Sequence, residues 1–113
     1  MRTFIGAKDF QESRQFYQEL GFKELPISGK LSFFTVDRLG FYLQDFYVKD
    51  WIENSMIFLE VDDVERYQQE MQKLRLPENY ETVKITAIHD NEWGKEFFMH
   101  DPSGVLWHFG VFY

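Results

Sequence analysis

The sequence repeats one pattern of predicted elements twice, and this repeat limits the folds open to a chain of 113 residues. Near the start, the alternating run "RTFIGA" predicts a strand, and "KDFQESRQFYQELGF" places apolar residues at helical spacing until Gly21 ends the pattern. Asp9 and Glu12 have the spacing of a capping box, so Asp9 is the expected N-cap. Three period-two runs, "FKELPI", "LSFFTV" and "GFYLQDF", then predict antiparallel strands. The first half is therefore a strand, a helix and three strands.

The second half begins the same pattern again. In "SMIFLEVDDVERYQQEMQKL" an apolar run and a pair of aspartates precede a helix with an apolar stripe. Pro77 is expected to end this helix, and "YETVKITAI", "KEFFMH" and "VLWHFGVF" predict three more strands. We therefore divide a single domain, residues 1–113, into module one (1–47), a polar linker (48–54) and module two (55–113). Roughly 55 residues seldom form a stable core alone, so the modules must share one.

Composition excludes several classes of protein. Nineteen acidic and twelve basic residues give a net charge of −7, which argues against a nucleic-acid partner because phosphate binding needs a basic face. The chain has no cysteine, no long apolar stretch and no signal-peptide pattern, so we expect a cytoplasmic protein without disulfides or a membrane partner. Aromatic residues make up 19% of the chain, more than a core of this size readily absorbs. Some of them should line a cavity or an interface.

The repeated β-α-β-β-β module, the phrase "AKDFQESRQFYQELGF" and the closing "WGKEFFMHDPSGVLWHF" resemble the vicinal oxygen chelate superfamily. That superfamily contains the glyoxalases, the extradiol dioxygenases and the bleomycin-resistance proteins. The resemblance implies an α+β fold in which eight strands form one curled mixed sheet, a cup with the helices outside. In the metal enzymes of the superfamily four residues on the concave side hold the metal. Carrying these positions over gives Arg2, Gln44, Met56 and His108.

These four side chains are a poor donor set for a divalent transition metal. An arginine cannot deprotonate and places a fixed positive charge where the cation would lie, and one imidazole with one weak amide does not complete a site. The resemblance then implies metal-free binding similar to the bleomycin-resistance proteins, with no metal, no cofactor and no catalytic residue. The alternative is a metal-dependent lyase, isomerase or dioxygenase with other ligands, such as Asp45, Glu60 or His100.

Alternation along the strands predicts which side chains face the cup, because successive residues of a strand point to opposite faces. If Arg2 and Met56 face the cup, the helix side receives Ile5, Ala7, Ile57, Leu59 and Val61, and in the last strand Val105, Trp107, Phe109 and Val111. Trp107 should therefore be structural. The run "KEFFMH" leaves the parity of Phe97, Phe98 and His100 open. The predicted ligand-binding set comprises Arg2, Phe4, Tyr42, Gln44, Phe46, Trp51, Met56, Phe58, Glu60, Trp93 and His108.

We predict that this set binds a cationic or aromatic small molecule in a homodimer. The negative charge favours a cationic ligand, although acidic surfaces also serve solubility. Arg2 could hold a ligand carboxylate or pair with Glu60, and the aromatic residues could instead fill the cup or contact a second subunit. His108 could contact the ligand or be bonded to a neighbour, whereas His89 and His100 are expected to be solvated.

Overall fold

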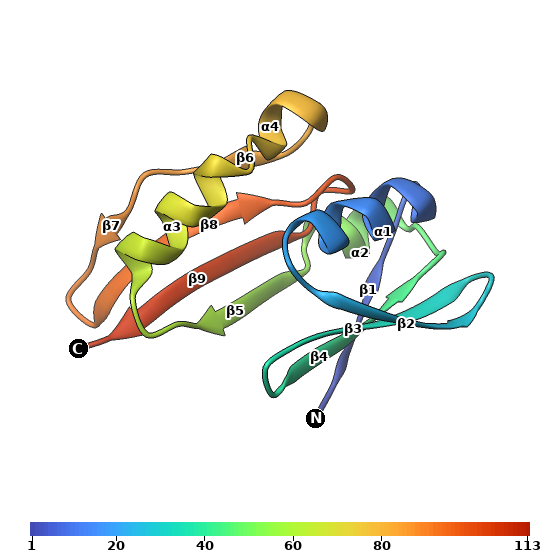
Figure 1. The fold of residues 1–113 in the computed structure, drawn as a ribbon, viewed down its shortest axis with the longest axis horizontal. Coiled ribbons are helices and arrows are strands. Elements are labelled where there is room, and N and C mark those ends of the chain that lie inside the picture. The colour runs from blue at the N-terminus through green and yellow to red at the C-terminus, as the bar shows by residue number, and fades with distance from the viewer.

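The computed structural model describes all 113 residues as two consecutive modules of strands and helices (Figure 1). The first module contains β1 (Thr3–Gly6), α1 (Phe10–Glu19), β2 (Lys23–Ser28), β3 (Leu31–Val36) and β4 (Leu39–Gln44). The second contains β5 (Met56–Glu60), α3 (Val64–Lys73), α4 (Leu76–Asn79), β6 (Lys84–Ile85), β7 (His89–Asp90), β8 (Gly94–His100) and β9 (Leu106–Phe112). The predicted α+β class and its tandem modules are confirmed.

The strands form two mixed sheets, one for each module, where the sequence suggested one curled sheet of eight. Their orders are β1-β4-β3-β2 and β5-β9-β8-β6, with β7 also paired to β8. In each sheet the first strand of the module runs parallel to the last one, and the other pairings are antiparallel. The run "YETVKITAI" yields only the two-residue strand β6, because the Thr86 hydroxyl accepts the N–H of Phe98 and interrupts the backbone ladder; β7 follows just after the run.

Both long helices begin at an aspartate N-cap. The side chain of Asp9 accepts the Glu12 N–H, and that of Asp63 accepts the Arg66 N–H, each at 3.1 Å. The N-cap role of Asp9 was predicted, and Asp63 has the same role in the second module.

The linker contains a helix that the sequence did not suggest, and the prediction for Pro77 was wrong. The polar linker contains a helix, α2 (Lys49–Glu53), whose buried Ile52 packs over Gly6 where a Cβ would lie only 2.5 Å from the Ile52 Cδ1. Pro77 does not end α3, which stops at Lys73. Instead it lies in the first turn of α4, a position that proline suits because the N–H it lacks has no partner there.

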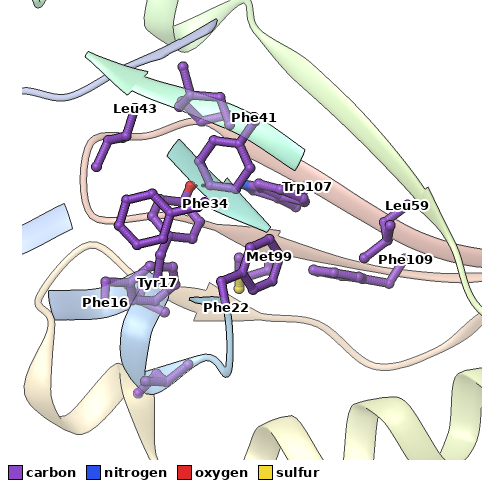
Figure 2. Packing of buried hydrophobic residues seen from close by; sticks show 14 of the residues in the cluster. Phe16, Tyr17, Phe22, Phe34, Phe41, Leu43, Leu59, Met99, Trp107 and Phe109 are labelled. Atoms are coloured by element: carbon purple, nitrogen blue, oxygen red, sulfur yellow. Dashed lines mark hydrogen bonds between the residues drawn. The ribbon is translucent and has the colours of Figure 1, made fainter. Parts of the chain in front are cut away.

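The modules share one core on the helix side of both sheets, and its centre is aromatic (Figure 2). Tyr17 of α1 packs against Phe41 of the first sheet and Trp107 of the second, with ring centroids 4.9 and 5.9 Å apart. Its hydroxyl donates to Asp101 at 2.6 Å and accepts the Trp107 Nε1–H at 3.0 Å. Burial raises the pKa of the Tyr17 phenol well above its usual value, so the hydroxyl stays a donor. These bonds join α1 to the second module.

The "DPSG" turn, residues 101–104, is held by the same carboxylate. Asp101 is fully buried, and its second oxygen accepts the backbone N–H groups of Ser103, Gly104 and Val105 at 2.8 to 2.9 Å. Burial raises the pKa of Asp101, and these hydrogen bonds oppose the rise. The turn is therefore a junction between the modules as well as a link between β8 and β9.

Candidate functional site

Each sheet has a helix side, which forms the core, and an open face on the opposite side. The predicted alternation holds: Ile5 and Leu59 are buried, whereas Phe4 and Phe58, one residue earlier in their strands, are 59% and 41% exposed. Trp107 is buried, as predicted. The sequence left undecided which residues of β8 face the core. Phe97 does, because it is buried, whereas Phe98 lies on the open face beside His108 in the β8–β9 pairing.

The open face of the first sheet carries a small cationic and aromatic cluster. Phe4 stacks on Tyr42 with ring centroids 4.8 Å apart, and Phe33 lies 5.1 Å from the same ring. The Arg2 Nη1 donates to the Tyr42 hydroxyl at 3.2 Å, and its guanidinium carbon lies 4.5 Å from the centre of the Phe33 ring. Arg2 does not pair with Glu60, which belongs to the second sheet. Sequence reasoning missed Phe33, although its alternation with the buried Phe34 was a usable signal.

The open face of the second sheet carries a larger aromatic wall. Phe58 contacts Trp93 and Phe112 with ring centroids 5.9 and 5.5 Å apart, and Trp93 lies 5.2 Å from Phe112. The His108 imidazole lies next to this wall, 6.2 Å from Phe58 and nearly parallel to it, with Phe98 edge-on at 4.8 Å. Phe112 was not in the predicted set. A planar ligand could stack on these exposed rings.

A hydrogen-bonded chain on the same face as this wall fixes His108. Its Nδ1 lies 2.8 Å from one Glu96 carboxylate oxygen, and the other oxygen accepts the Asn91 side-chain amide at 2.9 Å. Glu96 is almost completely buried. Glu96 was not predicted, because the parity of "KEFFMH" was undecided, and Asn91 lies in the loop before that run. The expectation that His108 is bonded to a neighbour is correct, and its other ring nitrogen stays free for a ligand.

The strand register corrects one of the positions carried over from the metal enzymes. Phe4 pairs with Tyr42 in β1–β4, and Phe58 pairs with His108 in β5–β9. The duplication therefore makes Tyr42, and not Gln44, the counterpart of His108. Gln44 pairs with Gly6, two residues further along. The first module has no "DPSG" turn from which to count, which explains the error.

The corrected positions still do not fit a divalent metal ion. Arg2 and Tyr42 lie on the first sheet, and their counterparts Met56 and His108 lie on the second. A guanidinium, a phenol, a thioether and one imidazole are an unsuitable donor set. The chain contains no group of three or more His, Cys, Asp or Glu side chains placed to hold an ion.

The remaining predicted residues lie apart from these two clusters. Phe46 and Trp51 are exposed and contact each other at the start of α2, with ring centroids 5.8 Å apart. Met56 and Gln44 are exposed at strand ends. Glu60 lines a groove of about 300 Å³ where the two modules meet. Of the two histidines expected to be solvated, His89 is exposed and packs on Phe98, whereas His100 is half-buried.

No aromatic contact joins the open-face rings of the two sheets within one chain. The aromatic contacts of Phe4, Phe33 and Tyr42 stay on the first sheet, and those of Phe58, Trp93 and Phe112 stay on the second. The core lies on the helix sides of the sheets, which leaves both open faces uncovered.

The tandem modules agree with the result of a comparison with known protein families. The model of the Glyoxalase/Bleomycin resistance protein/Dioxygenase superfamily matches residues 2–109. The chain belongs to this superfamily. No curated protein is detectably related by sequence.

Solved structures of the superfamily share the fold at low identity. A bleomycin-binding protein from Streptomyces verticillus, complexed with copper(II)-bleomycin, has a TM-score of 0.83 at 17% identity, over 98% of this chain and 93% of that one. An antibiotic-binding protein from Streptomyces sp. CB03234 has a TM-score of 0.78 at 17% identity, over 99% and 93%. A lactoylglutathione lyase from Agrobacterium tumefaciens has a TM-score of 0.74 at 18% identity, over 98% and 91%.

These neighbours include binding proteins and an enzyme, so membership of the superfamily leaves catalysis open. None of the helices is long and apolar enough to cross a membrane.

Proposed function

We propose that this chain binds a small aromatic or cationic molecule at its open faces without a metal ion, and that two copies assemble over those faces. The observation that carries the proposal is the exposed wall of Phe58, Trp93 and Phe112 beside His108. Monomeric proteins rarely leave a contiguous aromatic surface uncovered, and rings next to a few polar groups are the usual lining of a ligand site.

The donor chemistry supports the metal-independent part of the proposal. Arg2 brings a permanent positive charge to its position, and His108 is the single imidazole at the four carried-over positions. The fold neighbours that bind bleomycin or another antibiotic are consistent with a binding role.

A second copy is the proposed cover for the open faces. If the first face of one chain meets the second face of its partner, Arg2 and Tyr42 approach Phe58 and His108, and a groove forms between them. A two-fold dimer would then contain two identical grooves, since each contact occurs twice in such an assembly.

Ligand binding can be tested by titrating the protein with bleomycin and with ethidium, a cationic aromatic probe, while following tryptophan fluorescence and heat. We expect saturable binding of at least one probe, weakened about tenfold or more in Phe58→Ala because stacking area is lost. Leu74→Ser is a matched control, since Leu74 on the helix side is 42% exposed against 41% for Phe58. Absence of binding by both probes, or equal weakening in the control, would contradict the proposal.

Assembly is measured separately by sedimentation at micromolar concentration. We expect a dimer that becomes monomeric in the double variant Phe4→Ser/Phe58→Ser and persists in Leu74→Ser. Bound metal per chain, measured after incubation with Zn, Ni, Mn or Fe(II) and desalting, should be close to zero. A ratio near one that is lost in His108→Ala would instead favour the metal-dependent lyase, isomerase or dioxygenase.

A further inference from the structure

We propose that His108 is a hydrogen-bond acceptor held in one tautomer by Glu96 and Asn91, and that the ligand is a planar aromatic molecule carrying an O–H or N–H donor. The inference rests on the proposed function, because it concerns the same open face, and it narrows the class of ligand.

The tautomer follows from the two contacts of Glu96. A carboxylate only accepts hydrogen bonds, so the nitrogen 2.8 Å from its oxygen, His108 Nδ1, must carry the proton. Asn91 donates to the other carboxylate oxygen and keeps the group oriented. In the neutral imidazole the remaining nitrogen, Nε2, is then an acceptor. Glu96 and Asn91 are positioning residues, since they would act on the ligand only through His108.

The Nε2 atom is available to a ligand. It makes no hydrogen bond within the chain, and no side-chain nitrogen or oxygen is both buried and unpaired. Nε2 therefore reaches solvent, in agreement with the 23% exposure of the His108 side chain.

The surrounding rings define the shape of the donor-bearing molecule. Phe58 lies nearly parallel to the imidazole, Phe98 is perpendicular to it, and Trp93 extends the wall beyond Phe58. A planar aromatic molecule can stack on Phe58 while a donor at its edge reaches Nε2. A ligand without that donor would displace water from Nε2 and leave this acceptor without a hydrogen bond. Sites built around a hydrogen-bonding group bind such ligands much more weakly.

The tautomer is tested by long-range ¹H–¹⁵N NMR of the histidine side chains. At a pH where the imidazole is neutral we expect His108 to show a protonated Nδ1 and an unprotonated Nε2. In Glu96→Gln the Asn91 amide should hold the glutamine oxygen, which turns the glutamine amide toward Nδ1 and reverses the tautomer. A purely structural Glu96 would leave the tautomer unchanged, and an Nε2–H form in the native protein would overturn the proposal.

Ligand class is tested by calorimetry with naphthol and its methyl ether, which differ only in the donor. We expect naphthol to bind at least about tenfold more tightly, the effect of one well-formed hydrogen bond. His108→Phe keeps a ring but removes the acceptor, so the ratio should fall to about one. Leu74→Ser is the control and should keep the ratio, because Leu74 ends α3 on the helix side, away from His108.

The outcomes separate this inference from the proposed function. Equal binding of the two compounds by the native protein would overturn the donor requirement and leave an aromatic binding site in place. Binding of neither compound, together with no binding of bleomycin or ethidium, would overturn the proposed function itself.

Discussion

The two sides of each sheet are built from adjacent residues but differ in how completely their groups are partnered. On the helix side Trp107 is 3% exposed and its Nε1–H is bonded to Tyr17. One residue later, His108 keeps a free Nε2 and lies beside exposed rings. The helix side therefore contributes stability, whereas the open face leaves surface and hydrogen-bonding capacity for another molecule. Adjacent substitutions in one strand should consequently have opposite phenotypes.

The sharpest test substitutes two neighbours in β9. Trp107→Ala removes a buried ring from the shared core and should lower the free energy of unfolding by about 3–5 kcal/mol. His108→Ala should cost less, about 1–2 kcal/mol, because the side chain is partly exposed and its loss removes one hydrogen bond from the nearly buried Glu96. Urea unfolding of both variants measures the difference. Equal losses would mean that the open face belongs to the stabilising core.

The second prediction concerns the polar junction of the helix side. Asp101→Ala leaves three backbone N–H groups of the turn and the Tyr17 hydroxyl without their acceptor, so we expect a loss of about 3 kcal/mol. Tyr17→Phe removes one member of the network and should cost about 1–2 kcal/mol.

Thermal and urea unfolding of these two variants should rank them in that order. A loss below about 1 kcal/mol for Asp101→Ala would show that the modules do not depend on the turn for their attachment.

Local pattern was enough to predict the helix side but not the open face. Ile5, Leu59 and Trp107 were placed correctly because alternation needs only a strand and one residue of known orientation. Glu96 was missed because "KEFFMH" offers several bulky residues and no such reference. Gln44 was taken, in place of Tyr42, as the counterpart of His108, because the register of a parallel strand pair is set by residues far apart in the chain. The separation of the two open faces depends on module packing, which no local pattern records.

The third prediction compares two glycines of the open face that differ in what an added Cβ would meet. A Cβ at Gly94 would collide with the backbone carbonyl of Val111, which cannot move independently, so Gly94→Ala should cost about 1–3 kcal/mol. At Gly110 the Cβ would lie 2.7 Å from the exposed Phe58 ring, which can swing away, and 3.0 Å from the Lys95 carbonyl. We expect Gly110→Ala to cost about 1 kcal/mol or less and to weaken ligand binding, as measured by unfolding and by the fluorescence titration.

The smallest expected effect is a change in acid stability at Glu24 of β2. Burial alone would raise the pKa of Glu24, but hydrogen bonds from Arg14, Ser32 and Gln18 lower it below the ordinary value of 4.5. The ionised form is therefore favoured in the folded state. Its stabilisation is fully present above the unfolded-state pKa and is lost as the pH falls through the lower folded-state pKa.

Glu24→Gln should reduce stability at neutral pH and flatten the loss of stability as the pH falls below about 4.5. Glu60→Gln is the matched control, because Glu60 is exposed and has no hydrogen-bond or ion-pair partner. Unfolding free energies measured from neutral to acidic pH give both slopes. If stability changed with pH by the same slope in both variants, the hydrogen-bonded carboxylate of Glu24 would be no more stabilising than the unpartnered one of Glu60. The contrast between the helix side and the open face would then not extend to charged groups.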